Sequence, residues 1–133
     1  IPGNIDIAQQ IELAKKLEIL GVDLIQTEGL KEVTNSTNPS SHLVNYAKAT
    51  IENTMELIQH TSIPVMSASG ISAKTAPLAF ASGASAVGVG AAVNKLDSEV
   101  AMCATVMSIV SSISYRNSIN KEIVRTSREL SLR

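Results

Sequence analysis

Two short segments join small residues to glycine in a pattern that predicts an anion site. Segments 67–72 (SASGIS) and 83–93 (GASAVGVGAAV) each run from apolar residues into glycine. This is typical of a buried parallel strand whose end turns tightly beside a ligand. We expect a phosphate group to be bound there by the backbone N–H groups of Gly70, Ile71, Gly90 and Ala91. Lys74 is near enough along the first loop to add a positive charge, although the glycines could instead serve only tight turns and helix packing.

A carboxylate and an amide end an earlier predicted strand, 22–29 (VDLIQTEG). Side chains alternate along a strand, so Gln26 and Glu28 share one face with Leu24. If that face lines the site, Glu28 can act as a general base and Gln26 can hydrogen-bond a carbonyl or hydroxyl group. The alternative is that Glu28 is a structural carboxylate bound by a neighbouring loop.

The remaining candidates for chemistry are weaker. His42 stands at a loop–helix junction, where a capping or surface role is expected. Cys103 lies among Ala101, Met102 and Ala104, which predicts a buried structural thiol rather than a nucleophile. No His, Cys, Asp and Glu residues have the spacing of metal ligands, so no metal site is predicted.

Composition excludes several classes of partner. The net charge is −1, so no overall field favours nucleic acid. No apolar run reaches the roughly 20 residues of a membrane span, and no signal or transit peptide is visible. The single cysteine rules out an internal disulfide.

Predicted helices and strands alternate along the chain. Asp6 and Gln9 resemble a capping box that starts a helix ending at Gly21. Polar segment 31–41 is predicted to be a loop, either a lid over the site or a plain connector. The other predicted elements are helix 42–60, strand 65–69, helix 75–82, strand 85–91 and a helix from residue 97 or 98 to about residue 115.

Alternating helices and strands predict an α/β fold with a parallel sheet. We interpret residues 1–115 as the C-terminal half of an eight-stranded β/α barrel, about strands six to eight. The 133 residues are roughly half of the ~250 usual for such a barrel, and the first residue is Ile1, so a fragment is expected. A half-barrel that forms a homo-oligomer and an open doubly wound sheet are the alternatives. Residues 116–133 are predicted to form a basic C-terminal helical tail, solvated rather than partner-binding.

The glycine segments resemble the seventh and eighth strands of phosphate-binding barrels. Such families include indole-glycerol-phosphate synthase, ribulose-phosphate epimerase, thiazole synthase and flavin-dependent oxidoreductases. Ser69-Gly70-Ile71 stands where those families often have Gly-Gly-Ile, and Ala91 stands where a serine or threonine often follows. Strand 22–29 also resembles the strand of deoxyribose-phosphate aldolase that carries its Schiff-base lysine. Gln26 takes that place and cannot form an imine.

A more specific resemblance covers residues 1–115. The stretches QTEG (26–29) and VNKLDSEVAM (93–102) are similar to those of the family called hypothetical chloroplast open reading frame 23. The resemblance implies a plastid-encoded barrel protein with no assigned activity. It also implies a chloroplast location, or a cytoplasmic one if the chain comes from a cyanobacterium.

Three functions remain open at this stage. One is a metal-independent isomerase or lyase acting on a phosphorylated small molecule, with Glu28 and Gln26 as catalytic residues. The second is an oxidoreductase that binds flavin mononucleotide (FMN) by its phosphate. The third is a barrel without catalysis that acts as a sensor or assembly partner. Neither nucleic acid nor membrane is an expected partner of any of these.

Overall fold

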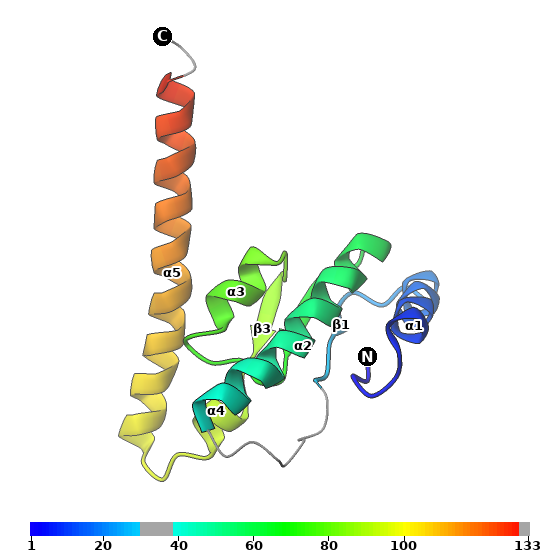
Figure 1. The fold of residues 1–133 in the computed structure, drawn as a ribbon, viewed down its shortest axis with the longest axis horizontal. Helices are drawn as coiled ribbons and strands as arrows, with labels where there is room; N and C mark the ends of the chain where they lie inside the picture. Colours follow the sequence, from blue (N-terminus) through cyan, green and yellow to red (C-terminus); the bar gives the residue numbers. More distant parts are fainter. Residues whose placement is uncertain (30–38, 131–133) are drawn as a thin grey trace.

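The computed structural model describes residues 1–29 and 39–130, with side chains for 1–29 and 47–114. Helices and strands alternate as the sequence predicted (Figure 1). The helices are α1 (Ile7–Ile19), α2 (Pro39–His60), α3 (Ala76–Ala81), α4 (Ala91–Asn94) and α5 (Glu99–Leu130). The strands are β1 (Ile25–Gln26), β2 (Val65–Ala68) and β3 (Ala86–Gly88). Most of the predicted loop 31–41, and the side chain of His42, lie outside the described residues.

Local sequence signals set both ends of α1. The Asp6 side chain accepts a hydrogen bond of 2.9 Å from the backbone N–H of Gln9, which satisfies a donor that the first turn leaves free. At the other end Gly21 takes a φ of 80°, a left-handed conformation that glycine adopts without steric cost. The helix therefore begins and ends where the sequence predicted.

The three strands form one parallel sheet in the order β1-β2-β3. Gln26 lies beside Met66, and Met66 lies beside Ala86. A helix connects each strand to the next, which is what parallel neighbours require. The α/β class, and a parallel sheet with neighbours in chain order, are thus confirmed.

Helices α1, α2 and α3 pack on one face of this sheet. Ile25 and Val65 point to that face and join Leu57 of α2 and Ala14 of α1 in one core cluster. Val87 of β3 lies beside Ser67, which has the same parity along β2 as Val65, so it points the same way. It packs against a second cluster that links α3 to Ile109 of α5.

The opposite face of the sheet is open among the described residues. It carries Gln26, which is exposed, and Met66 and Ala86, which are half-buried. The sequence predicted strands buried on both faces, because their apolar runs resemble those of a closed parallel sheet. Ala68 also lies on this face and is buried, but none of these residues belongs to either core cluster of the described chain, which accounts for the difference.

The C-terminal helices, α4 and α5, differ from the prediction in three respects. Helix α5 does not end near residue 115 but continues to Leu130, so its C-terminal end extends well beyond the other elements (Figure 1). One-turn helix α4 precedes it and was not predicted. Cys103 is exposed, not buried, because it faces away from the side of α5 on which Ile109 packs.

In the part of the chain described, no helix combines the length and apolarity needed to cross a membrane.

Candidate functional site

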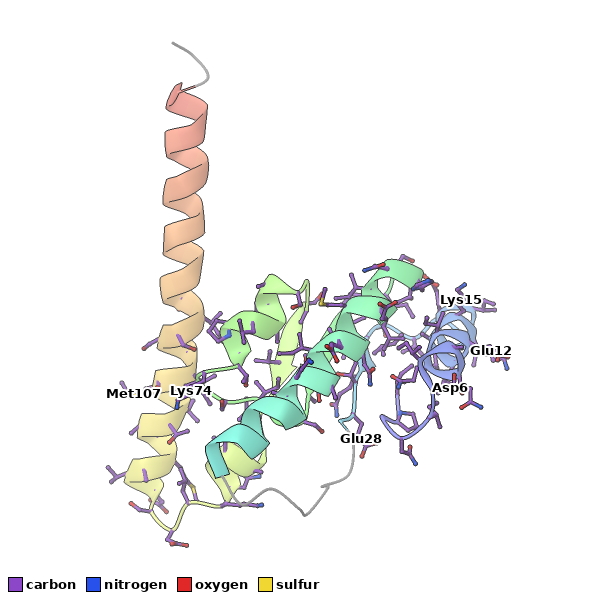
Figure 2. All side chains as sticks on the ribbon, in the orientation of Figure 1. Asp6, Glu12, Lys15, Glu28, Lys74 and Met107 are labelled. Atoms are coloured by element: carbon purple, nitrogen blue, oxygen red, sulfur yellow. The ribbon has the colours of Figure 1, made fainter. Side chains whose placement is uncertain are left out.

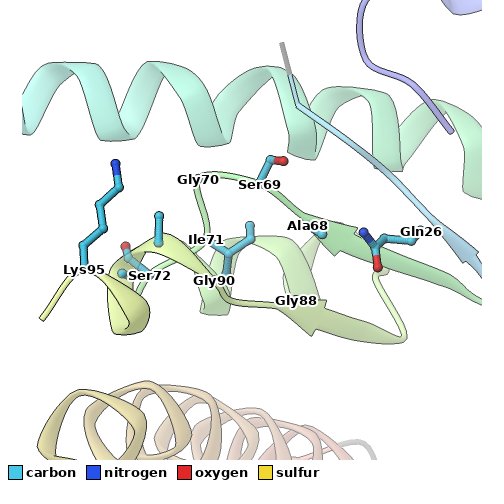
Figure 3. A pocket seen from close by; sticks show the side chains of 11 residues that line it. Gln26, Ala68, Ser69, Gly70, Ile71, Ser72, Gly88, Gly90 and Lys95 are labelled. Carbon is cyan, nitrogen blue, oxygen red and sulfur yellow. The ribbon is translucent and has the colours of Figure 1, made fainter. Parts of the chain in front are cut away.

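A cavity of about 600 Å³ lies at the edge of the sheet where the three strands end (Figure 3). The loops after β2 and β3 form most of its wall, and β1 contributes one side chain. The lining residues are Gln26, Ala68, Ser69, Gly70, Ile71, Ser72, Gly88, Gly90, Ala91, Ala92 and Lys95. Four of the predicted phosphate-binding residues, Gly70, Ile71, Gly90 and Ala91, therefore lie together around one space.

The loop after β2 is held in an unusual conformation. Ser69 and Gly70 have φ values of 88° and 71°, and a left-handed serine is uncommon. Thr75 stabilises this turn: its hydroxyl accepts a hydrogen bond of 2.9 Å from the N–H of Ser72 and donates one of 3.2 Å to the carbonyl of Gly70. The turn thus fixes the peptide groups of Gly70 and Ile71 at the cavity wall.

The two glycines after β3 have different roles. A Cβ on Gly88 would lie 3.0 Å from the Cβ of Ala68, so this glycine lets β3 pack closely on β2. A Cβ on Gly90 would meet no atom within 4 Å, and the φ of Gly90 is −114°, a value open to other residues. No described atom therefore crowds a Cβ at position 90. The space beside it belongs to the cavity.

Backbone donors at the cavity wall are unpaired. Within the described residues, the N–H groups of Gly70, Ile71, Gly90 and Ala91 have no hydrogen-bond acceptor. Ile71 is buried and Gly70 is half-buried, whereas Gly90 and Ala91 are exposed, so these donors are accessible to a ligand that enters the cavity. Backbone N–H groups that gather around one cavity suit an anion.

Lys95 lines the cavity, whereas the predicted Lys74 does not. Lys74 is exposed, lies beside α5 and is not part of the cavity wall (Figure 2). Lys95 follows α4, and this single helical turn returns the chain to the cavity. Lys95 follows Gly90 by only five residues, which could have indicated a lysine near the glycine loop. The spacing can be interpreted only once the helical turn between the two residues is known.

Gln26 and Glu28 share a strand face, as predicted, but differ in their relation to the cavity. Gln26 lines it, whereas Glu28 is exposed at the C-terminal end of β1 and is not part of the wall (Figures 2 and 3). The N–H of Glu28 donates a hydrogen bond of 3.0 Å to the carbonyl of Ile1. Its role in proton transfer stays a prediction.

A buried hydroxyl group ties β1 to the elements around the site. The Thr27 Oγ1 atom lies 3.3 Å from the Thr54 hydroxyl of α2, and accepts a hydrogen bond of 3.3 Å from the N–H of Ala68. All three residues are buried. Thr27 therefore holds the end of β2 at a fixed distance from β1, at the point where the loop with Gly70 begins. Among the described residues, no group of three or more His, Cys, Asp or Glu side chains is placed to hold a metal ion.

Comparison with known proteins gives a consistent result. The family described as "Protein of unknown function (DUF561)" matches residues 1–119. An uncharacterised protein named ycf23 from Pyropia yezoensis is 33% identical over 129 residues, which are 97% of this chain and 47% of that protein. The ycf23 protein of Cyanophora paradoxa is 36% identical over 116 residues, 86% of this chain and 47% of the relative. The one from Cyanidium caldarium is 41% identical over 90 residues, 68% of this chain and 36% of the relative.

The chain spans less than half the length of each of these relatives. They are plastid-encoded proteins, which supports a chloroplast location for this one. The resemblance to the hypothetical chloroplast open reading frame 23 family is confirmed, and the chain belongs to this ycf23 family, described as DUF561.

Proposed function

We propose that this chain is the phosphate-binding part of a β/α barrel that takes a phosphorylated small molecule. The observation that carries the proposal is one cavity whose wall includes Lys95 and four residues with unpaired backbone N–H groups. The donors come from the ends of two adjacent parallel strands. An anion there would gain several charge-assisted hydrogen bonds, each worth about 1.5–3 kcal/mol.

The barrel is supported first by the distribution of the helices. Helices α1, α2 and α3 pack on one face of the sheet, and the cavity opens at its other face. This is the arrangement of a barrel wall, with helices outside and a lined interior. In a doubly wound sheet, further helices would have to cover the face that carries Gln26, Met66 and Ala86.

The edge of β1 gives independent support. The Ile1 nitrogen donates to the carbonyl of Gln26, and the N–H of Glu28 donates to the carbonyl of Ile1. These two bonds flank Thr27 in the pattern of a parallel ladder. Ile1 thus pairs with the edge of β1 in the parallel sense, which supports a further parallel strand there, as a barrel requires.

Exposed apolar side chains at both ends of the helical layer also support the barrel. Ile19 on α1 is 85% exposed, and Val100 and Met107 on α5 are 79% and 69% exposed. Exposed apolar residues grouped on one helix mark an interface. Since the relatives are about twice as long, we assign these faces to the rest of the barrel.

Isomerase or lyase chemistry is the activity that we attach to this site. Glu28 is the one carboxylate among the described residues that directly follow the three strands, so it is the candidate acid or base. Gln26 would orient a carbonyl or hydroxyl group of the substrate. The phosphate would be held by the loops after β2 and β3.

The test is to identify what the protein binds in its host. The complete natural protein is purified from plastids without phosphate buffer, denatured, and its released small molecules are analysed by mass spectrometry. We expect enrichment of a phosphate ester over a Gly90→Val variant prepared in the same way. Release of FMN would assign the phosphate site to a flavin cofactor. A protein that releases no phosphorylated compound and does not bind inorganic phosphate would contradict the proposal.

A further inference from the structure

The charge of the cavity restricts what it can hold. Among the described residues that line the cavity, Lys95 is the one ionisable side chain. A phosphate monoester carries a charge of about −1.5 to −2 near neutral pH. One ammonium group and a few N–H donors suit one such group. A second phosphate would find no counter-charge among these described residues, and an unpaired charge is costly wherever water is displaced.

The size of the cavity shows that phosphate alone would leave most of it empty. Its volume of about 600 Å³ equals the space of roughly 20 water molecules at ~30 Å³ each. Phosphate has five heavy atoms. The remaining space is therefore available to an organic group of ordinary ligand size.

The arrangement of the lining residues gives this organic group a direction. Lys95 and Gln26 stand at opposite ends of the row of lining residues, with Gly70 and Gly90 between them (Figure 3). Ala68 and Ile71 add apolar surface in between. A molecule anchored by phosphate beside Gly90 and Lys95 would extend along the sheet toward β1.

Gln26 sets the chemistry at that far end. Its side chain is exposed on the open face, and its amide makes no hydrogen bond within the described residues. An amide offers both a donor and an acceptor and carries no charge. It therefore matches a hydroxyl or carbonyl group better than a carboxylate or a second phosphate.

We infer that the ligand is a phosphate monoester with a single phosphate group and an uncharged, hydroxyl- or carbonyl-bearing body that contacts Gln26. This rests on the proposed function, since it requires the phosphate to lie at the glycine loops. It goes further by favouring one phosphate group over two, and by making Gln26 the residue that distinguishes the body of the ligand.

The test is isothermal titration calorimetry on the complete natural protein and on its Gln26→Leu and Lys95→Gln variants. The probes are inorganic phosphate, glycerol 3-phosphate, ribose 5-phosphate, hexyl phosphate and fructose 1,6-bisphosphate. We expect at least one of the two hydroxylated monoesters to bind about tenfold or more tightly than phosphate, hexyl phosphate and the bisphosphate. Gln26→Leu should weaken that monoester about tenfold and leave inorganic phosphate unchanged, whereas Lys95→Gln should weaken both.

The outcomes separate the inference from the proposal beneath it. Binding of phosphate with no preference for either hydroxylated monoester would overturn the inference alone. So would tighter binding of the bisphosphate, or a monoester affinity that does not respond to Gln26→Leu. If none of the probes binds, or if Lys95→Gln changes no affinity, the phosphate site itself is wrong.

Discussion

Replacing Gly90 with valine tests the backbone donors with little disturbance of the fold. The φ of Gly90 is −114°, and a Cβ there would meet no atom within 4 Å, so the variant should fold with a melting temperature within a few degrees of the parent. The added side chain enters the cavity and keeps an anion away from the N–H groups of Gly90 and Ala91. Losing most of two charge-assisted hydrogen bonds costs about 2–4 kcal/mol, or about 30- to 700-fold in affinity.

Calorimetry with a phosphate monoester measures this loss, and circular dichroism confirms that the variant is folded. Ala104→Val on the exposed side of α5 adds the same side-chain type away from the cavity, and should leave the affinity unchanged. Gly70→Ala is a poorer test, because the φ of 71° makes any side chain there strained. A folded Gly90→Val protein that binds with the parent's affinity would refute the assignment of phosphate to these donors.

Three further predictions concern other parts of the molecule. Glu28→Gln should leave phosphate affinity within about twofold, because Glu28 is outside the cavity wall, and should lower turnover by about 10²–10⁴-fold; full turnover would make it a structural carboxylate. Residues 1–133 expressed alone should self-associate through the exposed apolar faces of α1 and α5, and a cooperatively unfolding monomer in analytical ultracentrifugation would contradict this. The Ser62 hydroxyl and N–H donate hydrogen bonds to the Glu18 carboxylate and lower its pKa below the usual 4.5. The stability that these bonds contribute is therefore present above pH 4.5 and should be lost as the pH falls through the lowered pKa. This loss should be smaller in Glu18→Gln.

The sequence was most informative where one residue has one physical role. Asp6 and Gly21 mark the two ends of α1 as predicted, because a carboxylate cap and a left-handed glycine act within a few residues of their own position. The apolar runs predicted the three strands, and the alternation of strands with helices predicted that the strands are parallel. Gly70 and Gly90 lie at one cavity because parallel strands bring their C-terminal ends to the same edge of the sheet.

The sequence predicted less well which way a side chain faces and which side chains line the cavity. Cys103 has apolar neighbours in sequence, but burial on a helix depends on which side faces the core. The sequence favours Lys74 and gives no sign that Lys95 lines the cavity, because a four-residue helix such as α4 is too short to show a hydrophobic period. Strand parity placed Gln26 and Glu28 on one face, but it could not show that the cavity wall includes Gln26 and stops before Glu28.

The central claim is that backbone N–H groups at the ends of β2 and β3 hold a phosphate group. The most direct measurement is a titration of the complete ¹⁵N-labelled protein with a phosphate monoester, followed amide by amide by NMR. The account predicts that the amide signals of Gly70, Ile71, Gly90 and Ala91 shift together along one binding curve, while that of the exposed Gly21 stays in place. Saturable binding of the monoester with those four amides unmoved would contradict it.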